Sequence, residues 1–130
     1  MTRRRIATDT GSVSIQAALV VVPALFFVLI LSLQFTFAWM AAAAVQTAAE
    51  NAADAASARN GSVADGQAAA DRVLSSTGYA TVTDSSINIA DGTVRVELRA
   101  RAYQFFPVAW NVVGVAESSI EDFRSSEERQ

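Results

Sequence analysis

A long uncharged segment constrains this chain more than any other feature of its sequence. No charged residue occurs between Asp9 and Glu50, and Val, Ile, Leu and Phe fill most positions from Leu19 to Phe37. A helix needs roughly 20 apolar residues to cross a bilayer core about 30 Å thick. These side chains favour insertion by roughly 5 kcal/mol, which exceeds the cost of the few polar residues among them. The segment therefore predicts one membrane-spanning helix over residues 12–39.

Composition excludes several kinds of site. The chain has 130 residues and contains no cysteine and no histidine. Disulfides, thiolate catalysis, Cys or His zinc sites and His-based triads are therefore excluded. The net charge of −3 and the scattered basic residues argue against nucleic-acid binding. Because no phosphate loop and no carboxylate cluster at metal-ligand spacing is present either, we expect no enzymatic activity, cofactor, metal or small-molecule substrate.

Charges on the two sides of the span predict its orientation. Arginines occupy positions 3 to 5, whereas the first charges after the span are Glu50 and Asp54. Basic flanks remain on the cytoplasmic side of a membrane. We therefore expect a single-pass protein of the cytoplasmic membrane, with the basic segment 1–11 inside and residues beyond about 45 outside.

The basic segment permits three interpretations. It is a retained flank of a membrane anchor, a leader that is removed, or the start of an ordinary secretory signal cut near Ala41–Ala44. The third is disfavoured, because the apolar region of such a signal is about 7 to 15 residues long and this one is far longer.

Polar or unusual residues mark the span. Pro23 removes one helical hydrogen bond and is expected to kink or loosen the helix, which membrane helices tolerate. Gln34 either bonds a partner helix, for about 1 kcal/mol, or is solvated near the outer interface. Trp39 fits the outer aromatic belt of a membrane protein.

An alanine-rich segment, residues 40–60, extends the helix beyond the span. Alanine is the best helix former, and Asn60-Gly61 is a typical helix stop. The whole helix would then contain about 45 residues and measure about 65 Å. Its small side chains allow neighbouring helices to approach closely, or alternatively the segment packs on its own head domain.

A second helix is predicted over residues 63–77. Ser62 is a suitable N-cap with Asp65 in capping-box position, Gly78 is a natural terminator, and Gly66 weakens the helix. The predicted apolar face comprises Val63, Gln67, Ala70, Val73 and Leu74.

Asp91-Gly92 predicts a β-hairpin, because both turn positions favour a positive φ. A two-residue loop pairs Ala90 with Thr93 and Ile89 with Val94, which puts the large apolar residues on one face. Apolar positions continue through Leu98, Ala100 and Ala102, and the other face carries Arg95, Glu97, Arg99, Arg101 and Tyr103. The arginines could contact lipid headgroups or a partner, but a solvent-exposed sheet face is the favoured interpretation.

A third strand is predicted over about residues 112–121, with Val113, Val115 and Ile120 inward. The aromatic run before it, Phe105 to Trp110, is expected to cover the core or pack on the long helix. The head domain would span residues 61–124 and the polar tail residues 125–130. The expected fold is α+β: a long N-terminal helix, a short second helix and a small antiparallel sheet of about three strands.

Three segments together resemble the TadE-like family, the pilin-like components of Flp (tight-adherence) pilus systems. The first is Gly11-Ser-Val-Ser-Ile-Gln16-Ala-Ala-Leu-Val-Val-Val-Pro23, a glycine and small residues before an aliphatic run with a proline. The second is the alanine-rich run from Gln46 to Ala56. The third combines Ala69-Ala-Asp-Arg-Val-Leu with a closing strand that ends Ile120-Glu-Asp-Phe. The likeness lies in their order and spacing and covers nearly the whole chain.

The resemblance implies export, cleavage by a prepilin peptidase between Gly11 and Ser12, and a role in pilus assembly beside other pilin-like proteins. Gln16 stands where the family usually has a glutamate that neutralises a neighbouring subunit's terminal amine. A glutamine cannot neutralise that amine, which favours a minor subunit over a regular filament subunit. Gln16, Pro23 and Gln34 are then the expected assembly positions of the helix. The alternative is an uncleaved, single-span envelope protein whose head domain binds a partner.

Overall fold

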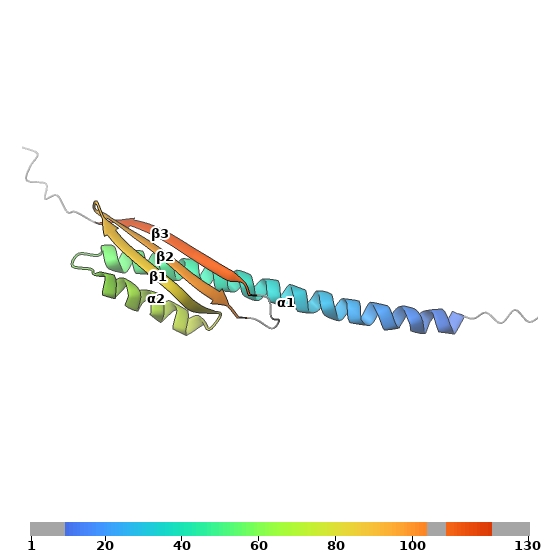
Figure 1. The fold of residues 1–130 in the computed structure, drawn as a ribbon. Coiled ribbons are helices and arrows are strands. Elements are labelled where there is room, and N and C mark those ends of the chain that lie inside the picture. The colour runs from blue at the N-terminus through green and yellow to red at the C-terminus, as the bar shows by residue number, and fades with distance from the viewer. Residues whose placement is uncertain (1–9, 104–108, 121–130) are drawn as a thin grey trace, which may run out of the picture. The chain divides into compact units, whose positions relative to one another are not determined.

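The computed structural model describes residues 10–103 and 109–120, with side chains described from residue 14 onward. Helices α1 (Thr10–Ser57) and α2 (Val63–Thr77) precede strands β1 (Ala80–Ala90), β2 (Thr93–Ala102) and β3 (Asn111–Ser119) (Figure 1). The predicted α+β fold is confirmed. The chain divides into two compact units, an N-terminal unit, Met1–Gln34, and a C-terminal unit, Phe35–Gln130.

Helix α1 contains both the apolar segment and most of the alanine-rich segment. It continues through Pro23 as one helix. It ends at Ser57, slightly before the predicted stop, and Asn60 follows with a left-handed φ of 68°. Gly61 donates its N–H to the carbonyl of Ala58 at 2.6 Å. A Cβ on Gly61 would lie 2.7 Å from the carbonyl oxygen of Ala56, so the chain can cross the end of α1 here only with a glycine.

Helix α2 has the predicted bounds and caps. The hydroxyl of Ser62 accepts the Asp65 N–H at 3.3 Å, and the Asp65 carboxylate accepts the Ser62 N–H at 2.9 Å. Gly78 ends the helix with a φ of 66° and donates to the carbonyl of Leu74 at 3.3 Å. The capping box and the glycine stop therefore fix both ends of α2.

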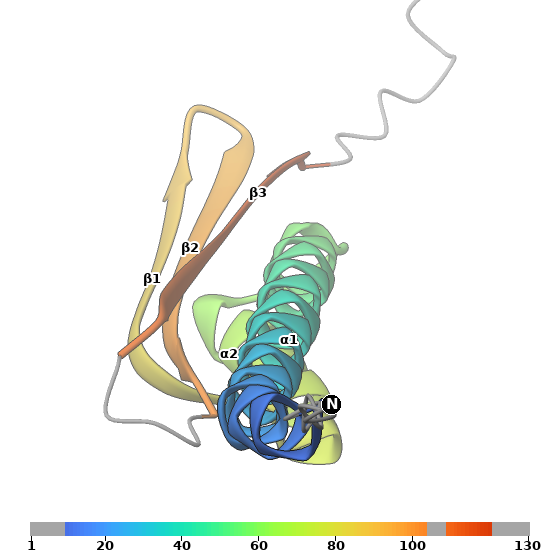
Figure 2. The same ribbon diagram turned by 90° about the vertical axis from the view of Figure 1, so that its right-hand side faces the viewer.

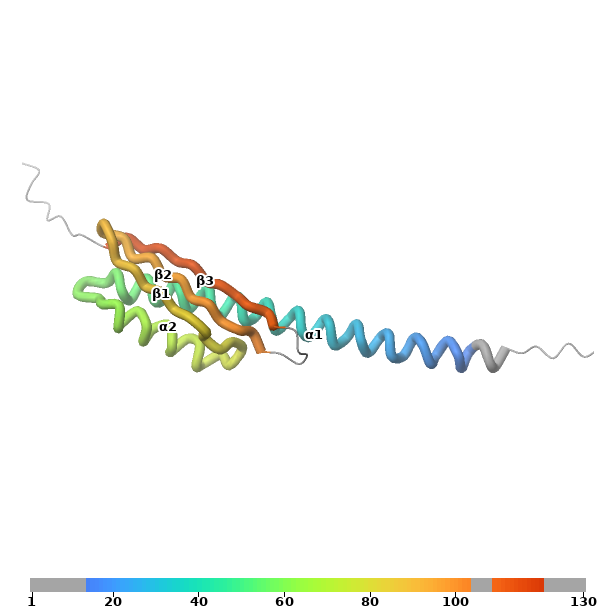
Figure 3. Tube along the Cα trace, in the orientation of Figure 1, coloured from blue at the N-terminus to red at the C-terminus, as the bar shows by residue number. Residues whose placement is uncertain are grey.

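The buried face of α2 differs from the predicted one. It consists of Gly66, Ala70 and Leu74, whereas Val63 and Gln67 are exposed. A Cβ on Gly66 would lie 2.9 Å from the carbonyl oxygen of Ala52 in α1. The prediction is confirmed for Ala70 and Leu74 and is wrong for Val63 and Gln67, because close approach of the two helices selects the smallest side chain, Gly66, at the contact. In the Cα trace of Figure 3, α2 runs back beside the C-terminal part of α1.

The three strands form one antiparallel sheet in the order β1-β2-β3. The hairpin register is confirmed: Ala90 pairs with Thr93 and Ile89 with Val94. Asp91 and Gly92 have positive φ values of 52° and 73°, as a tight two-residue turn requires. Figure 2 shows α2 and the C-terminal part of α1 on the same side of the sheet.

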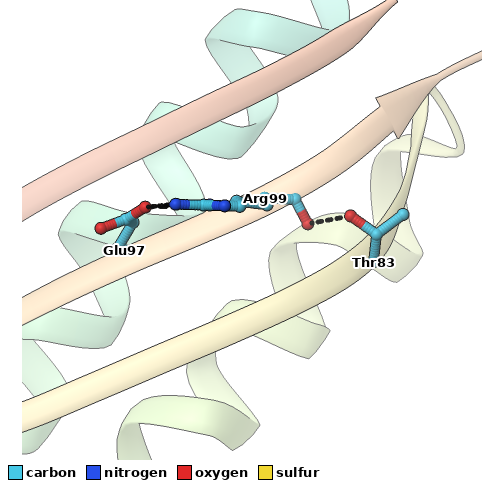
Figure 4. A network of polar contacts seen from close by, with 3 residues as sticks. All are labelled: Thr83, Glu97 and Arg99. Atoms are coloured by element: carbon cyan, nitrogen blue, oxygen red, sulfur yellow. Dashed lines mark hydrogen bonds and ion pairs between the residues drawn. The ribbon is translucent and has the colours of Figure 1, made fainter. Parts of the chain in front are cut away.

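A bulge interrupts the β1–β2 pairing at Thr83. Val82 pairs with Ala100 and Asp84 with Arg99, so Thr83 has no opposite residue. Its hydroxyl donates to the carbonyl of Arg99 at 3.1 Å (Figure 4). The side chain thus bonds a carbonyl of β2 at the point where the regular ladder is disturbed.

The core lies between β2 and the alanine-rich part of α1. Ala48, Ala49 and Ala52 are fully buried, as are Val94 and Val96 of β2. The inward face predicted for β2 is confirmed, because Leu98, Ala100 and Ala102 are also buried. The edge strand β1 is less covered, and its Ile89 is 41% exposed. Of the two roles considered for the alanine-rich segment, packing on the chain's own head is the one observed.

The inward face predicted for β3 is wrong by one residue. Gly114 and Ala116 are buried, whereas Val113 and Val115 are 53% and 40% exposed. Ile120 follows β3 and is 37% exposed. A Cβ on Gly114 would lie 2.6 Å from the carbonyl oxygen of Val45. The backbone of α1 therefore comes so close to β3 that glycine faces it, and the valines occupy the outer face.

Candidate membrane anchor and assembly surfaces

The N-terminal unit presents apolar side chains to its surroundings. The stretch Ser14–Ser57 of α1 is long and apolar enough to cross a membrane, and only 6% of its most apolar window is buried. Exposure on this scale is unusual for a protein surface in water and indicates lipid or a partner. The exposed side chains of this unit include Leu19, Val20, Leu25, Phe26, Phe27, Val28, Leu29 and Leu31.

The residues predicted to act in assembly lie along this helix. Gln16 and Pro23 are exposed, and Gln34 is 5% exposed. At 3.6 residues per turn, seven positions are about two turns and eighteen are five turns, so these three residues fall on nearly one face of α1. The side chain of Gln34 is buried within its own chain, and a hydrogen bond to a partner helix stays a prediction. The backbone of Gly11 and Ser12 lies in the first turn of α1, and cleavage between them stays a prediction.

Sequence reasoning missed a polar link between α1 and the edge strand β3. The Gln46 amide nitrogen donates to the carbonyl of Val115 at 3.0 Å, and its oxygen accepts the Val115 N–H at 3.2 Å. The same nitrogen donates to Glu50 at 3.0 Å. Nearby, the hydroxyls of Ser57 and Ser118 lie 3.0 Å apart. Gln46 and Val115 are 69 positions apart in the chain, so no local sequence pattern signals this link.

The outer face of the sheet carries the predicted arginine row. Arg95 pairs with Glu117 at 3.1 Å and Arg99 with Glu97 at 2.8 Å. The hydrogen bond from Arg99 to Glu97, helped by the Glu97 charge, raises the pKa of Arg99. Two of the three arginines are thus paired within the sheet face, as the solvent-exposed interpretation predicts. Over residues 10–103 and 109–120, no ion pair forms at Arg101.

An aromatic cluster lies at one end of the sheet. The Phe37 ring of α1 is 6.2 Å from the Tyr79 ring and 6.3 Å from the Tyr103 ring, between centroids. Tyr103 donates its N–H to the Tyr79 carbonyl at 2.9 Å. A shallow hollow of about 320 Å³ lies beside these tyrosines, lined also by Arg101 and Thr81. Phe105 to Val108 fall outside the described residues.

The described residues offer no obvious reaction centre. Three or more acidic residues that could hold a metal ion do not occur together in the described part of the chain. A second hollow, of about 250 Å³ between α2 and β1, is lined by Gln67, Asp71, Ser85 and Ile87. Its side chains include no nucleophile paired with a base. The surfaces with a clear physical meaning are therefore the apolar helix and the aromatic end of the sheet.

Comparison of the chain with known protein families, curated proteins and solved structures finds no relative. No family model matches the chain, and no curated protein and no solved structure is significantly similar to it.

Proposed function

We propose that this protein is a membrane-anchored structural component of a pilus-like assembly, a minor TadE-like subunit of a Tad/Flp system. The observation that carries the proposal is the composition of α1. Its N-terminal part exposes large apolar side chains, and its C-terminal part supplies the alanine side of the core. One helix thus joins a membrane-compatible segment to a small αβ head without an intervening loop.

The proposed location is the cytoplasmic membrane, with the basic segment 1–11 inside and the sheet outside. The basic residues before α1 and the acidic residues after the apolar segment support this orientation. The proposed partners are the lipid bilayer, other pilin-like or Tad assembly proteins, and a prepilin peptidase that cuts after Gly11. Once cut, Ser12 would be the first residue of a chain that is helical almost from its start.

Gln16 favours a specific second candidate, an anchor that keeps its leader. An unpaired charge within an apolar bundle is costly, and the neutral amide of Gln16 cannot neutralise a terminal amine. In this second candidate no new amine forms at Ser12, so no carboxylate is needed at position 16. The head would then act by binding another envelope component.

Secretion after cleavage near Ala41–Ala44 has less support. Ala41 is fully buried and Ala44 is 8% exposed. A cut at this point would remove the helical turn that precedes Val45, whose side chain is fully buried and whose backbone lies against Gly114. The head would lose part of its own core, which argues for an α1 that stays whole.

The mature N-terminus decides between these candidates. The full chain is recovered from native membranes and its first residue is identified by mass spectrometry. A start at Ser12 supports the pilin-like component, and a chain that retains residues 2–11 contradicts processing and leaves the plain anchor. A start near Ala42 contradicts both.

A matched pair of variants sharpens the test. Gly11→Val should block the cut, because a bulky side chain then precedes the cleaved bond. Ala7→Val makes the same kind of change within the leader but away from the bond, and should be processed normally. Equal processing of the two variants would contradict recognition of Gly11 by a prepilin peptidase.

A further inference from the structure

The aromatic end of the sheet differs from the rest of the surface of the C-terminal unit. Tyr79 immediately precedes β1, Tyr103 immediately follows β2, and Trp110 immediately precedes β3. The pairing register puts Ala80 opposite Ala102 and Arg101 opposite Asn111. Three aromatic residues from three strands therefore meet at one end of the sheet, where β1 begins, β2 ends and β3 begins (Figure 1).

Backbone and ring contacts hold this group together. Tyr103 bonds the Tyr79 carbonyl at 2.9 Å, and Ala102 donates to the Trp110 carbonyl at 3.0 Å. Phe37 contacts the rings of both tyrosines. We call Tyr79, Tyr103 and Trp110 the aromatic rim. Its position is thus fixed by the sheet and by α1.

The rim is too exposed to be ordinary core. Tyr103 is 55% exposed and Trp110 is 41% exposed. Trp39, two residues beyond Phe37 on α1, is 70% exposed. Tyrosine and tryptophan have an apolar ring and a polar group, and for this reason they gather at the boundary between acyl chains and headgroups.

Chain continuity indicates what covers the rim. Phe37, which contacts the rim, lies between Phe35 and Trp39, two exposed residues at the C-terminal end of the apolar run of α1. A membrane that surrounds this run must end near Phe37 and Trp39. Through Phe37, the rim is therefore in contact with the residues that follow the apolar run directly in the chain.

Arg101 adds a charge suited to a lipid headgroup. It lines the hollow of about 320 Å³ together with Tyr79 and Tyr103. Arg95 and Arg99 are paired with carboxylates, whereas no ion pair to Arg101 is present among the described residues. A guanidinium beside two phenol groups is well suited to bind a phosphate.

We propose that the aromatic rim is a second membrane contact, in which the rings of Tyr103 and Trp110 enter the interface and Arg101 binds lipid phosphate. The inference rests on the membrane anchoring within the proposed function, and not on pilus assembly or leader cleavage. It predicts that the head is held against the bilayer and not merely tethered to it.

The two tryptophans of the chain, Trp39 and Trp110, allow a direct test. Trp39→Phe leaves Trp110 as the sole reporter, and Trp110→Phe leaves Trp39. Each full-length variant is placed in nanodiscs of phosphatidylcholine and phosphatidylglycerol, with and without bromine on the upper part of the acyl chains. We expect brominated lipid to quench both reporters.

The outcomes separate this inference from the proposed function. Quenching of Trp39 alone would overturn the rim contact and leave the membrane span intact. Quenching of neither would overturn the rim and the anchor together. Identification of the N-terminus, described above, is independent of both results.

A second pair of variants tests the arginine in the Trp39→Phe background. Quenching of Trp110 should increase with the phosphatidylglycerol fraction of the nanodisc. Arg101→Gln should abolish this dependence. Arg95→Gln makes the same change at an exposed arginine near the start of β2, away from the rim, and should preserve it. Equal behaviour of the two variants would overturn the phosphate contact.

Discussion

Gln46 binds Val115 through both backbone groups of that residue, at 3.0 Å and 3.2 Å. Its side-chain amide takes the place that a neighbouring strand would occupy at the free edge of β3. Exposed strand edges invite pairing with other chains, and here a helix that also forms the core covers one position of the edge.

Removal of this link should destabilise the C-terminal unit. Gln46→Ala leaves two backbone groups of Val115 to solvent, and we expect a loss of about 1 kcal/mol in the free energy of unfolding. The measurement is denaturant unfolding of the full chain in detergent, followed by circular dichroism. Thr47→Ala, at the exposed next position of α1, is the control and should change stability much less.

The face of β3 that packs on α1, which carries Gly114 instead of the valines, gives a second prediction. Gly114→Ala puts a Cβ 2.6 Å from the Val45 carbonyl oxygen, and overpacking of this kind costs about 1–3 kcal/mol. Val113→Ala, at an exposed position, should cost less than about 0.5 kcal/mol. Thermal unfolding of both variants decides the matter. A larger loss for Val113→Ala would mean that the valines face the core.

The capping box of α2 should contribute measurably to the free energy of unfolding. Ser62→Ala removes the side-chain acceptor of the Asp65 N–H, and N-cap losses of this kind cost about 1 kcal/mol. Ser75→Ala removes only a bond to the carbonyl of Arg72 within the helix and is the matched control. Equal stability of the two variants in urea unfolding would contradict the role assigned to Ser62.

The paired charges on the outer sheet face should leave stability insensitive to pH near neutrality. The hydrogen bond to Glu97, helped by the Glu97 charge, raises the pKa of Arg99 above its ordinary value. Any stability gained from a raised pKa is fully present below the unfolded-state pKa and is lost only as the pH rises through the folded-state value. Because arginine already titrates far above neutral pH and the pKa of Arg99 is raised further, Glu97→Gln should not change the slope of stability between pH 6 and pH 9. A slope that appears only in Glu97→Gln would contradict this assignment.

Local chemistry made much of the fold predictable. The Asp91-Gly92 turn and the alternation after it specify the hairpin register, and Ser62, Asp65 and Gly78 specify the ends of α2. Each of these signals depends on residues a few positions apart, so it can be recognised in the sequence alone.

The errors come from close approach between distant segments. Gly66 and Gly114 face α1 because the helix backbone leaves no room for a side chain, whereas hydrophobic patterning looks for large apolar residues. The same reasoning missed Gln46, because its partner is a backbone group far away along the chain. The membrane-compatible helix was predictable from composition, but cleavage at Gly11 depends on another protein and stays a prediction.

The continuity of α1 has a mechanical consequence. Tension applied to the apolar segment would reach the sheet through a core helix, with no linker that could stretch first. The load would fall at once on the alanine packing, on the Gln46–Val115 bonds and on the Ser57–Ser118 hydroxyl pair. Because these contacts are spread along the helix, they would share the force instead of breaking one after another. The sheet would therefore resist being pulled away from α1.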